Sequence, residues 1–168
     1  MKRIIIPRFG VFAGLAVLAL LFGFWQCPAQ YVGPTSGPGS ANSIPQAQLI
    51  QPDALNHLLQ TRGSDKPLVL QVGSHLLFAE AHIAGSEYAG PGSQPAGLQV
   101  LQNRVATLSK KQPIVLYCGC CPWNRCPNLG PAFNQLRELG FTNIKVLYIA
   151  DNLGTNWVDK GYPVERSH

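Results

Sequence analysis

Most of the cysteines in this chain stand in one short stretch. The stretch reads Cys118-Gly-Cys-Cys-Pro-Trp-Asn-Arg-Cys126, so four of the five cysteines fall within nine residues. A disulfide between two members of so short a loop closes few residues and constrains the unfolded chain little, so structural cross-linking explains the cluster poorly. Thiols at this density instead favour nucleophilic chemistry, thiol–disulfide exchange or the binding of a soft metal ion.

The position of Cys118 favours a nucleophile. It follows the apolar run 113–117, which has the character of a buried parallel strand, and ligands of parallel α/β sheets bind beyond the carboxyl ends of the strands. The loop leads into a helix expected to start near Pro131, whose unpaired N–H groups stabilise a thiolate or a bound oxyanion. Arg125 adds a fixed positive charge. We therefore expect Cys118 and Arg125 to be catalytic.

The elements that must hold this loop alternate along the rest of the chain, which is typical of an α/β protein. Short, nearly continuous apolar runs predict buried strands at residues 67–72, 113–117 and 144–149. Apolar residues at helical spacing predict helices at residues 52–62, 76–81, 98–108 and 131–139, with a last helical turn around Trp157. We predict a small parallel sheet flanked by helices, in a domain that spans residues 49–168.

The N-terminal segment has the layout of an export signal. Three basic residues precede an apolar stretch from about Phe9 to Trp25, and small residues at Cys27 and Ala29 suit cleavage after Ala29. An uncleaved anchor is the alternative for residues 1–29, and lipid attachment at Cys27 is a third option. Residues 30–48 are rich in Gly, Pro and Ser and are expected to be a flexible linker. The folded domain is therefore expected outside the cytoplasm, periplasmic or extracellular.

The distribution of charge argues against a nucleic-acid partner. The chain carries a formal charge of +5, but without residues 1–29 only 10 basic and 8 acidic residues remain. No basic cluster in that remainder is larger than Lys110-Lys111. We expect no nucleic acid, contact with a membrane only through an uncleaved N-terminal segment, and a monomer.

Four ordered segments of residues 49–165 resemble the rhodanese-like domains. The matching segments are His82-Ile-Ala-Gly-Ser86, Ile114-Val-Leu-Tyr-Cys118, Leu136 to Phe141 with its Gly-Phe end, and Trp157-Val-Asp-Lys-Gly-Tyr-Pro-Val164. In that family, the cysteine after the strand takes a sulfane sulfur from a donor as a persulfide and passes it to a thiophilic acceptor. The resemblance implies a sulfurtransferase with Cys118 as nucleophile. With Arg125 nearby, we expect a small anionic donor such as thiosulfate, a thiol acceptor and no cofactor.

The chain also departs from the pattern of the resembled family. It has Gln71-Val-Gly73 where the family has Asp-x-Arg, and Asp151-Asn-Leu153 where the family has a Gly-Gly pair. Six residues separate Cys118 from Arg125, whereas the common loop has four; Cys120 fits the four-residue gap but lies off the strand end. Ordinary thiosulfate chemistry does not follow directly from such a loop.

The additional residues of the loop leave alternatives open. Cys120, Cys121 and Cys126 are possible resolving or auxiliary thiols, because each can attack a persulfide on Cys118, release sulfide and leave a disulfide. Cys118-x-x-Cys121 also suits a periplasmic thiol–disulfide oxidoreductase. A soft-metal site for Cu(I) or Zn(II) is a third interpretation, although the favoured one includes no metal. Trp123 is expected either to wall the pocket or to act as a packing anchor.

Overall fold

The computed structural model describes residues 41–61 and 66–167. Every described residue belongs to one compact unit, Pro34–His168. The expected export segment, residues 1–29, therefore lies outside the described residues. Among the residues that the structure describes, no helix combines the length and the apolar character that crossing a membrane requires.

A five-stranded parallel sheet forms the centre of the described unit. Its strands run in the order β1 (Leu49–Ile50), β6 (Ile144–Leu147), β5 (Ile114–Tyr117), β2 (Leu68–Gln71) and β4 (Glu87–Tyr88). All four neighbouring pairs in this sheet are parallel, and β5 occupies the middle position. A separate antiparallel pair joins β3 (His82–Ile83) to β7 (Val164–Glu165). The predicted α/β fold with a small parallel sheet is confirmed.

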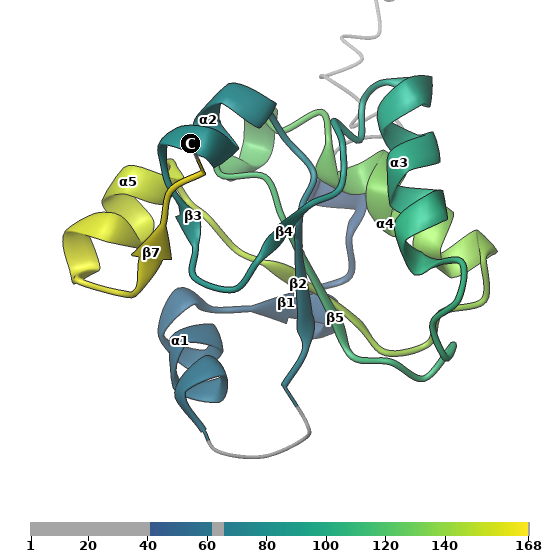
Figure 1. Ribbon diagram of the computed structural model, residues 1–168, viewed down its shortest axis with the longest axis horizontal. Helices are drawn as coiled ribbons and strands as arrows, with labels where there is room; N and C mark the ends of the chain where they lie inside the picture. Colours follow the sequence, from purple (N-terminus) through teal and green to yellow (C-terminus); the bar gives the residue numbers. More distant parts are fainter. Residues whose placement is uncertain (1–40, 62–65, 168) are drawn as a thin grey trace, which may run out of the picture. The chain divides into compact units, whose positions relative to one another are not determined.

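Helices cover both faces of the sheet (Figure 1). One face carries α3 (Pro95–Val105) and α4 (Leu129–Glu138), and the other carries α1 (Pro52–Gln60) and the segment around the short α5 (Leu153–Asn156). The side chains of β5 alternate between these layers, since Ile114 and Leu116 pack in the first core and Val115 and Tyr117 in the second. Helix α2 (His75–Glu80) follows β2.

The folded unit begins before residue 49. Two short 3₁₀ turns, η1 (Ala41–Ser43) and η2 (Gln46–Gln48), occupy part of the segment expected to be a linker. Ala41 and Ile44 are buried in the same core as α3 and α4. The Gly, Pro and Ser residues that dominate the composition conceal these two apolar side chains, whose burial fixes residues 41–48 against the domain.

Four two-residue strands escape the sequence patterns. Each of β1, β3, β4 and β7 contains only two residues, so none can show the alternation or the apolar run from which a strand is recognised. Their pairing depends on the neighbouring chain: β4, for instance, pairs with β2 through Leu70 and Glu87, and through Gln71 and Tyr88. The longer strands β2, β5 and β6 lie within their predicted ranges.

Candidate active site

Cys118 occupies the carboxyl end of the central strand β5. Its side chain is 2% exposed, and its carbonyl oxygen accepts a hydrogen bond of 3.2 Å from Nε2 of Gln71, at the end of the neighbouring strand β2. Behind it, a Cβ added to Gly73 would lie 2.9 Å from the Cys118 carbonyl oxygen and 3.0 Å from its Sγ. The backbone at Gly73, two residues after the end of β2, therefore packs directly against Cys118, and no side chain fits between them.

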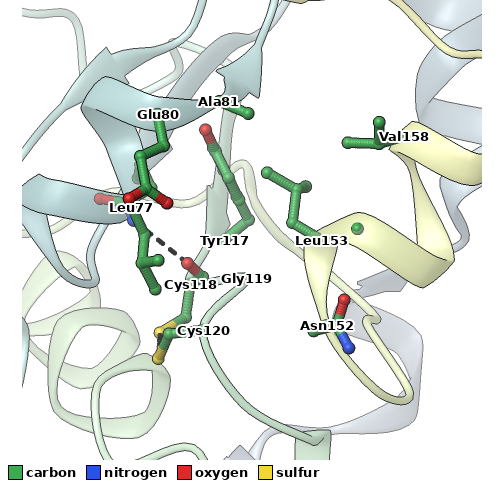
Figure 2. Close-up of a pocket in the computed structure, with 12 residues that line it drawn as sticks. Leu77, Glu80, Ala81, Tyr117, Cys118, Gly119, Cys120, Asn152, Leu153 and Val158 are labelled. Atoms are coloured by element: carbon green, nitrogen blue, oxygen red, sulfur yellow. Dashed lines mark hydrogen bonds between the residues drawn. The ribbon is translucent and has the colours of Figure 1, made fainter. Parts of the chain in front are cut away.

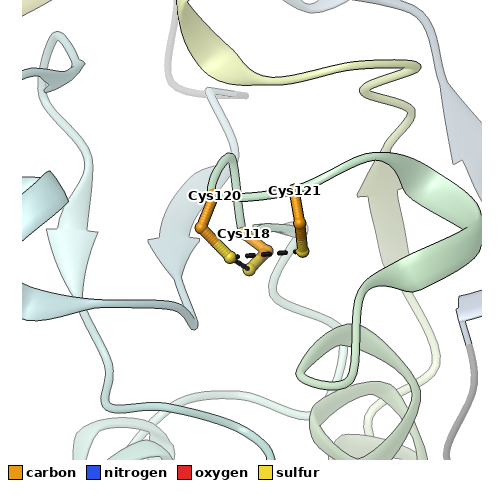
Figure 3. A group of neighbouring side chains, drawn as sticks. All are labelled: Cys118, Cys120 and Cys121. Atoms are coloured by element: carbon orange, nitrogen blue, oxygen red, sulfur yellow. Dashed lines mark hydrogen bonds between the residues drawn. The ribbon is translucent and has the colours of Figure 1, made fainter.

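The chain turns sharply after Cys118 and brings further thiols beside it. Gly119 has a φ of +77°, which favours glycine, and its carbonyl accepts a hydrogen bond of 3.0 Å from the Leu153 N–H. This turn places Sγ of Cys120 3.1 Å from Sγ of Cys118, and Sγ of Cys121 3.3 Å from that of Cys120 (Figure 3). The three sulfur atoms all lie within 4.8 Å of one another.

Cys126 is also part of this neighbourhood. It is buried, 4% exposed, and its thiol interacts with those of Cys118 and Cys121. All four described cysteines are free thiols. The structure therefore brings together the four thiols that the sequence singled out, with three of them, Cys118, Cys120 and Cys121, forming the closest group.

The hydrogen bonds between these thiols determine which of them ionises more easily. The hydrogen bond with Cys120 lowers the pKa of Cys118, but the adjacent Cys126 thiol and burial raise it, and the net result is a pKa of about 12. The same hydrogen bond with Cys118, together with burial, raises the pKa of Cys120. Burial raises the pKa of Cys121 as well. Because their shared hydrogen bond favours a thiolate on Cys118 over one on Cys120, Cys118 is the member of that pair prepared to act as nucleophile.

A pocket of about 280 Å³ opens beside Cys118 and Cys120. Figure 2 shows Leu77 and Glu80 of α2 on one side of it and Leu153 with its neighbour Asn152 on the other. Ala81, Tyr117 and Val158 extend the lining, which is mostly apolar. Of the described residues that line the pocket, Glu80 alone carries a charge. The pocket suits an uncharged organic group better than a small anion.

Asn128 makes the polar contact to the Cys118 sulfur that we expected from the backbone N–H groups at the start of a helix. This buried residue precedes α4, and its Nδ2 donates a hydrogen bond of 3.3 Å to Sγ of Cys118. Its Oδ1 accepts a hydrogen bond of 3.0 Å from the Ser93 N–H, which fixes the orientation of the amide. The start of α4 thus reaches the sulfur through a side-chain amide.

Arg125 and Trp123 lie away from the pocket at Cys118. Both belong to the 3₁₀ turn η3 (Trp123–Arg125); Arg125 is exposed, and neither residue lines that pocket. The Trp123 ring packs instead against Tyr148, with ring centroids 5.2 Å apart, and lines a separate hollow with Ile44. Six residues separate Cys118 from Arg125, two more than in a loop with a four-residue gap.

Sequence reasoning missed several residues that surround the thiols. Gln71 appeared only as a departure from a family pattern, and Asn128 only as part of the approach to a helix. A polar residue at the carboxyl end of a predicted strand and an amide just before a predicted helix are the signals that identify them. Leu77, Glu80 and Leu153 have no such signal, since their contact with the pocket depends on how α2 and α5 pack.

Comparison with known proteins supports the architecture. No protein-family model and no curated protein matches the sequence. Among solved structures, the Alr3790 protein from Anabaena sp. superposes with a TM-score of 0.54 at 22% identity, over 70% of this chain and 82% of that chain. A solution structure of the rhodanese-like domain of the same protein gives 0.52 at 22% identity, over 71% and 79% of the two chains. The BH2092 protein from Bacillus halodurans gives 0.55 at 22% identity, over 71% and 77%.

These likenesses and the topology define the class of the domain. The described residues form a domain with the rhodanese-like fold, and its cysteine cluster follows the central strand. The resemblance noted in the sequence is confirmed at the level of the fold.

Proposed function

We propose that this protein is a sulfurtransferase that carries a sulfane sulfur as a persulfide on Cys118. The observation that carries the proposal is the position of this thiol at the carboxyl end of β5, with a pocket open beside it on a rhodanese-like fold. Ligands of parallel α/β sheets bind at this edge, and Cys118 and Cys120 are among the residues that line the pocket.

The first step is attack by the Cys118 thiolate on the outer sulfur of a donor. The bond between that sulfur and the donor breaks, the donor leaves with the electron pair, and Cys118 holds the persulfide. Because the pKa of Cys118 is about 12 in the reduced cluster, the thiol must lose its proton as the donor approaches, and the departing donor group, which holds the electron pair, takes up a proton in its place. The hydrogen bonds from Cys120 and from the Asn128 amide stabilise the negative charge that develops on sulfur.

Two routes complete the turnover. An acceptor thiolate that attacks the outer sulfur becomes a persulfide and restores Cys118. Alternatively Cys120, with its Sγ 3.1 Å from that of Cys118, attacks the inner sulfur, expels hydrosulfide and leaves a Cys118–Cys120 disulfide. A dithiol must then supply two electrons and two protons to reduce the disulfide. The short sulfur–sulfur distance makes Cys120 the preferred resolving thiol.

The pocket also bears on the class of donor. An anionic donor was expected from Arg125, but the charged residue that lines the pocket is Glu80, which repels anions. The apolar side chains of Leu77, Leu153 and Val158 instead offer contact to an aliphatic group. We therefore propose an organic persulfide or polysulfide with an apolar body as the preferred donor.

Steady-state sulfur transfer tests both parts of this proposal. Cys118→Ser should reduce transfer to background, while Cys126→Ser should retain the first transfer. Glu80→Gln should improve the use of thiosulfate by roughly three- to tenfold relative to an aliphatic persulfide, since about 1 kcal/mol of repulsion is removed. Glu138→Gln on the exposed side of α4 is the matched control. Equal loss in Cys118→Ser and Cys126→Ser would instead indicate that the thiols act as one unit.

A thiol–disulfide oxidoreductase is the second candidate, favoured by the same 3.1 Å separation of Cys118 and Cys120. Such an enzyme exchanges electrons with a dithiol substrate and needs no sulfane sulfur. Rapid reduction of protein disulfides, combined with no transfer from any persulfide donor, would favour it.

We further propose that the domain works outside the cytoplasm, on the basis of the signal-like layout of residues 1–29. N-terminal sequencing of protein from an exporting host should begin at or near Gln30. Recovery of the chain with Met1 intact in the membrane fraction would identify an anchor.

A further inference from the structure

The closest thiol group has the geometry of a metal-binding site. The Sγ atoms of Cys118, Cys120 and Cys121 lie within 4.8 Å of one another, with separations of 3.1 and 3.3 Å for the two sequential pairs. Figure 3 shows the three side chains converging, although Cys120 and Cys121 are adjacent in the sequence. Adjacent side chains usually diverge; here the turn at Gly119 directs both toward Cys118. The convergence removes the main objection to a single ion held by this loop.

We propose that Cys118, Cys120 and Cys121 form a three-sulfur site for Cu(I), a soft monovalent ion. The group contains sulfur alone, and within the described residues no histidine or carboxylate joins it. Thiolate ligands select soft ions, whereas oxygen-binding ions such as Mg²⁺ and Ca²⁺ require carboxylates or carbonyls. The proposal is independent of sulfur transfer, because it concerns binding by the reduced thiols.

The number of sulfurs distinguishes Cu(I) from zinc. Cu(I) accepts three thiolates in a plane, and for metal–sulfur bonds near 2.3 Å the sulfurs then stand about 4.0 Å apart. The Sγ atoms of Cys118 and Cys120 are 3.1 Å apart and must separate by about 0.9 Å to reach this spacing. Rotation of the partly exposed Cys120 side chain provides this change. A structural zinc site takes four ligands, and Cys126 stands outside the mutually close group.

The surroundings suit an ion that enters from the pocket. Cys118 and Cys120 line the pocket, and Cys120 and Cys121 are partly exposed, so an incoming ion meets them before the buried Cys118. The side-chain amide of Asn128 donates a hydrogen bond to Sγ of Cys118. Hydrogen bonds of this kind, made to a ligand atom by a residue that does not itself bind the metal, orient metal ligands. Binding replaces three S–H protons with one Cu(I) and releases those protons to solvent; neither the metal nor the sulfur changes oxidation state.

Anaerobic titration of the reduced full-length chain with Cu(I), in competition with a chromophoric Cu(I) chelator, tests the site. We expect one tight equivalent per chain, with an ultraviolet sulfur-to-copper charge-transfer band. Cys121→Ser should weaken binding by roughly a hundredfold, since even outer contacts change metal affinity 10- to 100-fold. Cys126→Ser should weaken binding less than Cys121→Ser, because Cys126 lies outside the group of three and contacts only its members Cys118 and Cys121. Cys27→Ser controls for the fifth cysteine, and circular dichroism confirms that each variant is folded.

Two outcomes overturn the proposal. If Cys126→Ser loses binding as fully as Cys121→Ser, the site uses four sulfurs and not three. If the reduced wild-type chain competes no better than the folded Cys121→Ser variant, the three thiols do not bind Cu(I). Neither outcome depends on a sulfur donor, so failure of this site and failure of sulfurtransferase activity are separately detectable.

Discussion

At the scale of single residues, the neighbours of Cys118 act on it with opposite signs. The hydrogen bond with Cys120 lowers the pKa of Cys118, whereas Cys126 and burial raise it, to about 12 overall. An ordinary thiol with a pKa of 9.0 is half ionised at pH 9, but Cys118 in the reduced cluster remains protonated there. Its reactivity should therefore keep rising with pH above 9.

Two substitutions should shift this pH dependence in opposite directions. Cys120→Ala removes the hydrogen bond that favours the thiolate, so alkylation of Cys118 should require higher pH. Cys126→Ala removes a neighbour that raises the pKa, so alkylation should occur at lower pH, with roughly tenfold more thiolate for each unit of pKa. Peptide mass spectrometry after brief exposure to iodoacetamide at several pH values measures both. A change in the solvent accessibility of Cys118 multiplies its alkylation rate by the same factor at every pH and leaves the pH dependence unshifted. A shift of the pH dependence in the same direction in both variants would therefore contradict the account.

At the scale of elements, the loop between β4 and α3 positions the start of α4. A Cβ added to Gly92 would lie 2.2 Å from the Asn128 carbonyl oxygen and 3.1 Å from Cβ of Ala132. Gly92→Ala should therefore displace the start of α4 and cost about 1–3 kcal/mol of stability through overpacking. Since Asn128 donates to the Cys118 sulfur, the substitution should also alter the alkylation rate of Cys118.

Gly85→Ala is the matched control for this prediction. Gly85 is exposed, and a Cβ there would have no neighbour within 4 Å, but its φ of +74° makes alanine cost roughly 1–2 kcal/mol. Urea denaturation should show comparable losses for the two variants, while the reactivity of Cys118 should change in Gly92→Ala alone. Equal reactivity in both would mean that the loop does not position the site.

The elements also show how much of this fold the sequence predicts. The apolar runs of β2, β5 and β6 and the amphipathic helices are local patterns that the sequence shows directly. The run of β5 also predicts that Cys118 directly follows a strand. Arg125 could not be placed in the same way, because the turn η3 directs it outward although it lies in the cysteine loop. The lining by Leu77 and Leu153 depends on packing between distant segments, which no local pattern contains.

At the scale of the whole molecule, the segment before β1 belongs to the folded unit. Ala41 and Ile44 are buried, and Lys145 Nζ donates a hydrogen bond of 2.6 Å to the Ala47 carbonyl. A chain that starts at residue 49 should be less stable than one that starts at residue 40 by about 1.5–3 kcal/mol, the value of burying one large aliphatic side chain.

Thermal and urea denaturation of the two shortened chains measure this difference. The hollow lined by Ile44 and Trp123 should open when residues 41–48 are removed, so the tryptophan fluorescence should shift to longer wavelength. Equal stability and unchanged fluorescence would show that residues 41–48 act as the free linker that their composition indicates.

The intact mass of the protein after incubation with a persulfide donor tests the central claim most directly. The account predicts a gain of one sulfur atom by the reduced wild-type chain, located by peptide mapping on Cys118 and lost when an acceptor thiol is added. Cys118→Ser should gain none. Sulfur acquired equally by Cys118→Ser would contradict a sulfurtransferase that acts through Cys118. The same holds if a wild-type chain whose thiols are all reduced neither gains sulfur nor loses two hydrogens to a Cys118–Cys120 disulfide with release of sulfide.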